Sequence, residues 1–401
     1  MGSATRGENC MRLLCAGTFW TPSLRSTNSS CVQSALCRTH MRTKMALEVQ
    51  YLGTRFIGWQ PQPAVDGMAV FEAVHTALHA VGLPGGPVAS GRTDKGVHAM
   101  SNWLTVTVHR PPGRAVAPGP QRDAELEHLC AAINENLPTD VRCLRIVDAP
   151  PTAHAMTGAE GKVYSYFVLD GCTGALAAEC TGAWSNACWV LPETLDVQKI
   201  RKALPGLMGY RDFRQLCAIK DPRRDTRRTI HQASVCACSH RHFALLGCFE
   251  QTRPAARIVP GACSHCCGNC GGGSAADTAG DVDGAAGRPR LLQIRFAGDG
   301  FLKHQVRRMV GLLVAIGCGM EDPSATESIT HEPSPPLQAQ EAAARAGDTQ
   351  HRTFQAPAAG LWLESVDCRR MLSASDDAQT HKRPADHAGA CISCTEAVQD
   401  D

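Results

Sequence analysis

Strand and helix patterns alternate along this chain in the same order twice, and few folds accommodate that order. Each half runs strand, helix, strands, helix, strand. Strand patterns with a two-residue period occur near 46–52, 97–109, 141–147, 162–169, 229–237, 242–248, 291–297 and 361–367. Helical patterns with a period near 3.6 occur near 65–81, 123–137, 196–208 and 303–317. This order predicts an α+β protein built from two related halves, with helices covering one face of the sheets.

Changes in composition divide the chain further. The predicted parts are an extension at 1–44, a first half at 45–150, a second half at 151–369 and a polar, disordered tail at 370–401. Within the second half, residues 251–289 are rich in Gly, Ala, Asp and Cys without periodicity, which indicates an inserted low-complexity loop. Residues 321–355 are rich in Pro, Ala, Gln and Glu, which favours a largely irregular segment.

The extension has the composition of a targeting signal. It holds six Lys/Arg, twelve Ser/Thr and a single acidic residue, Glu8. Acid-poor segments rich in Arg and Ser are typical of organelle transit peptides, so we expect import into mitochondria. The alternatives are an unstructured extension or a true start at Met41 or Met45, with the protein in the cytoplasm or nucleus.

Charge is distributed unevenly along the chain. The chain has 401 residues, of which 43% are hydrophobic, enough for a sizeable core. The net charge is only +2, but nine Lys/Arg against three Asp/Glu fall in 201–230, and six against one in 288–308. Two such stretches favour a local anion-binding surface; solvated surface charge is the alternative. The longest apolar run, 309–320, is too short to span a membrane, so we expect a soluble protein without a membrane partner.

The 21 cysteines lack the spacing of a disulfide framework, so mostly reduced thiols are expected. Metal-binding residue types cluster in two places: Cys263, His265, Cys266, Cys267 and Cys270 in the insert, and Cys391 and Cys394 in the tail. Such pairs can hold zinc. Because no second pair has firm spacing and the surroundings are of low complexity, we prefer a cysteine-rich loop and assign no metal site.

The segment SGRTDKGVHA at 90–99 places opposite charges, Arg92 and Asp94, between Gly91 and Gly96. A strand pattern follows it directly. Gly, Asp and Lys are ordinary turn formers, so a simple turn is the preferred interpretation of this segment taken alone. Its interpretation therefore depends on the rest of the chain.

Four other motifs accompany this segment, in a fixed order. The five are YLGTRFIGWQPQP (51–63), SGRTDKGVHA (90–99), GKVYSYFV (161–168), GDGFLKHQVRRMVG (298–311) and APAAGLWL (356–363). Together they resemble the TruA-type tRNA pseudouridine synthases, and the variant HAMSN at 98–102 looks nearest to the eukaryotic pseudouridine synthase-like branch. The resemblance covers most of residues 46–367.

The resemblance implies a fold and a reaction. The fold is a mixed, mostly antiparallel sheet made from two related halves, with the active-site cleft between them. The reaction converts a uridine of tRNA to pseudouridine and implies no cofactor and no metal. The resemblance assigns a role to three residues. It makes Asp94 the catalytic carboxylate and Arg307 its cationic partner. It makes Tyr164 the tyrosine that packs under the uracil and moves its C5 proton. A nearby cation keeps such a carboxylate ionised against an anionic RNA.

The resemblance also implies substrate contacts. Arg92 matches an arginine that supports the nucleotide once it has flipped out of its stem. Glycines such as Gly91 let backbone approach RNA closely, and Lys95 is a further candidate contact in the same loop. His98 is a candidate phosphate contact, with a buried structural histidine as the preferred alternative. Two cations of the basic stretch 220–228, Arg223 and Arg224, are expected to bind the tRNA backbone.

Two departures from the family pattern stand out. Leu52 replaces the usual Asp of the first motif, and AHAM at 153–156 replaces Phe-His-Ala-Arg, which puts RNA positioning by that segment in doubt. The alternatives to an active enzyme are a non-catalytic RNA-binding relative and, weakest, a zinc-dependent RNA-binding module. The resemblance points to the anticodon stem-loop as target, while the particular uridine, and whether the protein is a homodimer, stay open.

Overall fold

The computed structural model describes residues 41–63, 65–110, 118–219, 221–238, 289–331 and 355–373. Its strands are β1 (Met41–Tyr51), β2 (Val88–Ala89), β3 (His98–Arg110), β4 (Val141–Ala149), β5 (Gly161–Asp170), β6 (Trp189–Val190), β7 (Gly209–Asp212), β8 (Arg227–Cys238), β9 (Arg290–Gly298) and β10 (Leu361–Asp367). Its α-helices are α1 (Val70–Ala80), α2 (Pro120–Asn136), α3 (Ala175–Trp184), α4 (Val197–Ala203), α6 (Gln305–Gly317), α7 (Ala325–His331) and α9 (Arg369–Leu372). Two 3-10 turns complete the set, η1 (Leu204–Leu207) and η2 (Ala358–Gly360).

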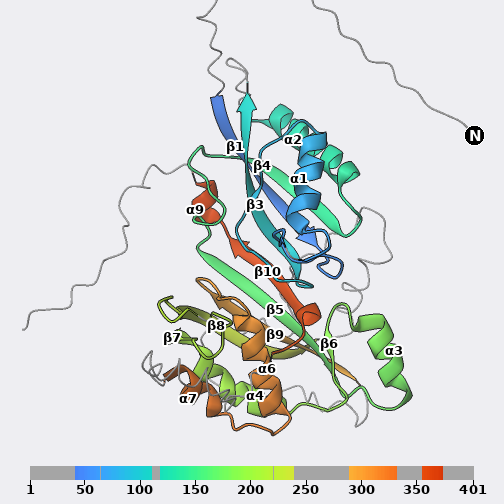
Figure 1. Cartoon of the computed structure of the whole chain (residues 1–401), viewed down its shortest axis with the longest axis vertical. Helices are drawn as coiled ribbons and strands as arrows, with labels where there is room; N and C mark the ends of the chain where they lie inside the picture. Colours follow the sequence, from blue (N-terminus) through green and yellow to red (C-terminus); the bar gives the residue numbers. More distant parts are fainter. Residues whose placement is uncertain are drawn as a thin grey trace, which may run out of the picture.

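The described strands form one continuous sheet (Figure 1), in the order β4-β1-β3-β10-β5-β9-β8-β7, with β2 beside β3 and β6 beside β5. Pairing is antiparallel except between β10 and β3 and between β5 and β6. The last described strand, β10, lies between β3 and β5, so it connects the strands β4, β1 and β3 to the strands β5, β9, β8 and β7. The predicted α+β fold with a mixed, mostly antiparallel sheet is confirmed. The division into related halves at 45–150 and 151–369 stays a prediction.

Helices cover this sheet at both of its ends. In Figure 1, α1 and α2 lie against the end formed by β4, β1 and β3, while α4 and α6 lie at the end formed by β9 and β8. Every residue of α6 from Met309 to Gly317 is buried, because α4 packs on it as well as the sheet. A smaller cluster that includes Phe167 and Trp362 lies on the opposite face of β5 and β10, and Trp184 of α3 packs against it.

Several element boundaries differ from the sequence predictions. The helix expected from 65 begins at Val70, because Gly67 has a φ of 127° and Ala69 is the N-cap whose N–H donates to the Glu72 carboxylate. Strand β1 begins at Met41, inside the expected extension 1–44, and pairs there with the end of β3. Helix α7 lies in the segment 321–355 that was expected to be largely irregular. The short helix α3 was not predicted.

Other predictions lie outside the described residues. They include residues 1–40, the strand pattern at 242–248, residues 251–288 of the insert with its cysteines, and the tail beyond Ser373. Of the helices that the structure describes, none has the length and apolar character needed to cross a membrane.

Candidate active site

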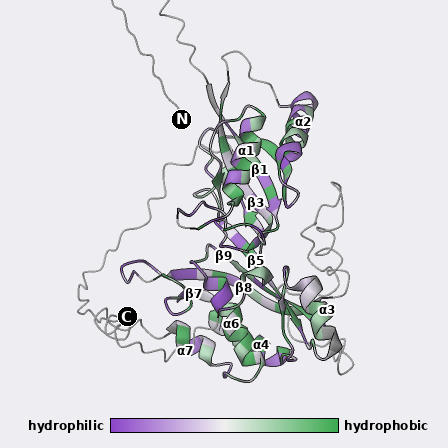
Figure 2. Ribbon diagram, turned by 45° about the vertical axis from the view of Figure 1, so that its right-hand side comes forward, coloured by the Kyte–Doolittle hydropathy of each residue, from purple (hydrophilic) through white to green (hydrophobic). Residues whose placement is uncertain are grey.

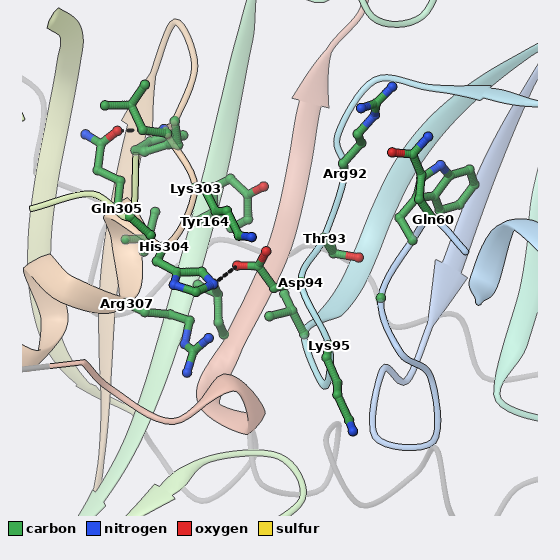
Figure 3. Close-up of a pocket in the computed structure, with 18 of the residues that line it drawn as sticks. Gln60, Arg92, Thr93, Asp94, Lys95, Tyr164, Lys303, His304, Gln305 and Arg307 are labelled. Atoms are coloured by element: carbon green, nitrogen blue, oxygen red, sulfur yellow. Dashed lines mark hydrogen bonds and ion pairs between the residues drawn. The ribbon is translucent and has the colours of Figure 1, made fainter. Parts of the chain in front are cut away.

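A cleft of about 1050 Å³ opens between the loop before β3 and the N-terminus of α6 (Figure 3). Its walls also include the loop after β1, strand β5 and the connection between β7 and β8. The three residues proposed for catalysis, Asp94, Tyr164 and Arg307, all line it, although they are far apart in the sequence. Arg92, Lys95 and Arg224 line it too.

Asp94 lies at the tip of the loop that leads into β3. The loop is braced by the first motif, since the Trp59 N–H donates to the Thr93 carbonyl (3.0 Å) and the Gly96 N–H to the Phe56 carbonyl (3.4 Å). Gly96 has a φ of 78°, a conformation that favours glycine. The Asp94 side chain keeps 30% of its surface exposed, so its carboxylate is open to a ligand in the cleft.

Beneath this loop, a buried network anchors its first residues to the sheet. Both backbone groups of Gly91 bond to the Asn102 amide, the N–H to Oδ1 (3.2 Å) and the carbonyl to Nδ2 (2.8 Å). Asn102 Nδ2 also donates to the Tyr51 hydroxyl (3.3 Å), which in turn lies 2.9 Å from the Thr93 hydroxyl. Since these groups are buried and satisfied, they fix the loop from which Asp94 projects.

Two of the predicted substrate contacts are buried and bonded within the protein. Gly91 is buried, and its backbone N–H and carbonyl each bond to the Asn102 amide. His98 is fully buried and stacked on Trp362, with ring centroids 4.2 Å apart. Its Nδ1 accepts from the Gly53 N–H, and its Nε2 lies 3.0 Å from the Ala359 carbonyl oxygen. It is therefore the structural histidine of the alternative interpretation.

Tyr164 faces the cleft from β5 and is otherwise buried. Its ring packs edge-on against Phe301, with centroids 5.2 Å apart. Burial raises the pKa of Tyr164 above its usual range, and the charges of Tyr51 and Asp94 act in the same direction. The phenol is therefore neutral at pH 7, which suits a ring that packs under a base better than a phenolate that removes a proton.

Arg307 lies in the first turn of α6 and lines the cleft. Its Nε–H donates to the Ala356 carbonyl at 2.8 Å. Burial lowers the pKa of Arg307, while the charges of Asp94 and Tyr166 oppose that shift. An arginine nevertheless stays protonated in proteins. Arg307 thus attracts Asp94 electrostatically, and the imidazole of His304 also approaches this carboxylate, with Nε2 3.5 Å from Oδ2.

The segment 356–360, which belongs to the last sequence motif, is held by contacts to three elements around the cleft. Arg307 holds Ala356 from α6, and the Tyr166 hydroxyl donates to the Pro357 carbonyl at 2.7 Å. His98 lies against the Ala359 carbonyl from β3. The segment therefore links α6, β5 and β3 just before β10 enters the sheet between the last two.

The remaining predicted contacts lie at different places around the cleft. Arg92 is exposed and points away from Asp94, on the side of the Gln60 loop (Figure 3). Lys95 is also exposed and points away from Asp94. Arg224 reaches the cleft from the β7–β8 connection, whereas Arg223 is exposed beside it. Figure 2 shows that connection as hydrophilic, in contrast to the apolar α6.

Sequence reasoning missed several residues of the cleft. They are Gln60, Met156, Lys162, Lys303 and His304. His304 and Lys303 lie in the quoted motif GDGFLKHQVRRMVG, and the three-residue spacing from His304 to Arg307 is a signal for one shared helical face. Met156 comes from the divergent AHAM segment, so that segment does reach the cleft.

Among the described residues, no group of three or more His, Cys, Asp or Glu side chains is close enough together to hold a metal ion. The cysteines of the insert and tail, Cys263 to Cys270 and Cys391 to Cys394, lie outside the described residues. The described walls of the cleft offer two carboxylates, an imidazole, a buried phenol and several cations.

Comparison with known proteins identifies the family of this chain. A family model described as tRNA pseudouridine synthase matches residues 203–355. The "tRNA pseudouridine synthase A" of Nitratidesulfovibrio vulgaris is 31% identical over 340 residues, which are 80% of this chain and 99% of that protein. The "tRNA pseudouridine synthase A" of Moorella thermoacetica is 28% identical over 324 residues, 80% of this chain and 98% of that protein. The human "tRNA pseudouridine synthase-like 1" is 29% identical over 341 residues, 84% of this chain and 93% of that protein. The chain belongs to the tRNA pseudouridine synthase family.

Proposed function

We propose that this protein isomerises a uridine in tRNA to pseudouridine, with Asp94 as the catalytic carboxylate. The observation that carries the proposal is the convergence of Asp94, Tyr164 and Arg307, from three distant segments, on one cleft of about 1050 Å³. The cleft is wide enough for a nucleotide that has left its stem, and base flipping is the general route by which enzymes reach such a base.

The proposed reaction exchanges one bond for another within the nucleotide. The N1–C1′ bond of the uridine breaks, the uracil turns, and a C5–C1′ bond forms. C5 loses its proton and N1 gains one, so the product is an isomer of the substrate. A carboxylate can serve such a reaction as nucleophile or base. Asp94 takes that part, Arg307 supplies positive charge beside it, and the neutral Tyr164 packs against the uracil.

The exposed cations around the cleft are suited to binding the tRNA. Arg92 and Lys95 stand on the Asp94 loop, and Arg223 and Arg224 on the β7–β8 connection. Phosphate contacts of this kind position an RNA without reading its sequence. We assign Arg92 to the flipped nucleotide and the other three to the tRNA backbone, with the anticodon stem-loop as the target region.

The test is single-turnover release of tritium from tRNA that carries 5-³H-uridine, with tRNA binding measured in parallel. Asp94→Asn should release no tritium yet bind tRNA as the wild type does, because the substitution keeps the shape and removes only the charge. If the wild-type protein binds tRNA without releasing tritium, the alternative of a non-catalytic RNA-binding relative is correct. Release at the wild-type rate by Asp94→Asn would instead show that another group is catalytic.

Location and assembly belong to the same proposal. We assign the protein to mitochondria because its first 40 residues, like the whole extension, are poor in acids and rich in Arg and Ser. Residues 1–50 fused to a fluorescent reporter should direct it to mitochondria, and a diffuse cytosolic or nuclear signal would contradict the assignment. Sedimentation of the purified protein distinguishes a monomer from a homodimer.

A further inference from the structure

His304 has a backbone conformation that is uncommon for residues other than glycine. Its φ is 61° and its ψ is 5°, which places it in the left-handed region, and it is the one residue other than glycine with a positive φ in the described parts of the chain. Residues other than glycine that are held in this region cluster at functional sites.

The neighbours of His304 impose this conformation. Gln305 is fully buried, its Oε1 accepts from the Leu302 N–H (2.8 Å), and its own N–H donates to the Leu302 carbonyl (3.0 Å). His304 is the N-cap of α6, and its carbonyl accepts the Arg308 N–H at 3.0 Å. Its side chain makes no capping bond to the helix. The imidazole is thereby turned across the cleft instead of along α6 (Figure 3).

The imidazole meets Asp94 from the opposite wall of the cleft. Its Nε2 lies 3.5 Å from Asp94 Oδ2, and the two side chains keep 23% and 30% of their surfaces exposed. The other titratable and charged groups lining the cleft are Arg92 and Lys95 before β3, Lys162 and Tyr164 on β5, Asp221 and Arg224 on the β7–β8 connection, and Lys303 and Arg307 beside His304. Only His304 among these is recorded in direct contact with the Asp94 carboxylate.

The protonation state of His304 suits contact with a working carboxylate. Burial lowers its pKa below the ordinary 6.5, and the charges of Arg307, Lys303 and Arg308 lower it further, while Asp94 opposes them. The ring is therefore neutral at pH 7. A neutral imidazole can donate one N–H without cancelling the negative charge of its acceptor.

We propose that His304 is a positioning residue for Asp94: the Nε2–H of His304 holds Oδ2 of Asp94 and leaves Oδ1 free for the nucleotide. This inference rests on the proposed function, in which Asp94 does the chemistry. It adds a pH dependence. When the pH falls below the lowered pKa of His304, the protonated imidazole pairs with Asp94 as a cation and withdraws its charge from the reaction.

Two substitutions test the inference in the tritium-release assay. His304→Gly removes the donor and accepts the left-handed backbone, so its fold should be kept. Its single-turnover rate should fall by roughly ten- to a hundredfold, because a catalytic group that is no longer held in place loses that much, with tRNA affinity unchanged. His304→Gln supplies an amide N–H in place of Nε2–H and should recover most of the lost rate.

The pH profile separates positioning from a structural role. The wild-type rate should fall as the pH drops through the pKa of His304, which lies below the ordinary 6.5, while His304→Gln, which cannot be protonated there, should show no such loss. A His304→Gly protein that reacts at the wild-type rate, or a shared acid limb in wild type and His304→Gln, would overturn the inference. Failure of the proposed function would look different, because the wild-type protein itself would then release no tritium.

Discussion

Two histidines in this molecule have lowered pKa values for the same cause, yet they are suited to different tasks. His98 is fully buried, bonded at both ring nitrogens and stacked on Trp362, so it holds β3 to the segment before β10. His304 is partly open to the cleft and touches Asp94. Residue type and motif membership do not distinguish them, and only their exposure and partners do.

Burial of His98 should make the fold sensitive to acid. Its pKa is lowered to about 4 from the ordinary 6.5, so between these values the unfolded chain binds a proton that the folded chain does not. The contribution of the neutral His98 to the free energy of unfolding is fully present above pH 6.5. It decreases by roughly 3 kcal/mol as the pH falls from 6.5 toward 4. Urea unfolding at pH 7 and pH 4.5 should show a smaller loss for His98→Asn than for the wild type. Equal losses in both proteins would contradict this.

We predict that the side chain of Asn102 holds the Asp94 loop in place. Asn102→Ala leaves the N–H and the carbonyl of Gly91 buried without partners, at a cost of roughly 2–4 kcal/mol in the free energy of unfolding, and should lower the single-turnover rate as the loop loosens. The control is Asn136→Ala, since Asn136 is exposed and bonds only within its helix. Unfolding in urea should separate the two variants clearly. Similar values for both would show that the loop is held by other contacts.

At the level of elements, the sequence predicted what depends on local periodicity. The helical pattern at 303–317 and the strand pattern at 361–367 are close to α6 and β10. The placement of β10 between β3 and β5 was not predictable, because strand neighbours are set by contacts far apart in the chain. The same holds for the turn before α6, where the backbone of His304 depends on Gln305 and Leu302 rather than on its own preference. The sequence motifs were sufficient to predict Asp94, Tyr164 and Arg307 as site residues. The contact of His304 with Asp94 could be seen only in the three-dimensional structure.

The short segment before β10 should tolerate almost no added volume. A Cβ at Gly360 would lie 2.5 Å from ring atoms of Tyr166. That ring is fully buried and tied to Pro357 through its hydroxyl, so it cannot move aside. Gly360→Ala should therefore lower the free energy of unfolding by roughly 1–3 kcal/mol. Gly300→Ala is the matched control, since a Cβ there meets nothing within 4 Å, and denaturant unfolding that fails to distinguish the two would contradict the packing argument.

Over the whole molecule, charge is concentrated rather than abundant. The net charge is +2, yet the described wall of the cleft gathers cations from the Asp94 loop, β5, the β7–β8 connection and the start of α6. The continuous sheet brings these segments together, because β10 connects β3 to β5. A polyanion would thus meet several cations around Asp94.

If that surface binds the tRNA backbone, replacing two of its arginines should weaken binding without altering the chemistry. Arg223→Ala combined with Arg224→Ala removes two exposed cations at and beside the cleft, and loss of two phosphate contacts should reduce the slope of log Kd against log salt by roughly 1.5–2. At saturating protein, the single-turnover rate should stay close to that of the wild type, because Asp94 and its partners are untouched. The matched control is Arg369→Ala with Arg370→Ala, two exposed arginines on α9 that do not line the cleft. Equal loss of affinity in both double variants would mean that tRNA senses only overall charge, and the cleft wall would then not be the binding surface.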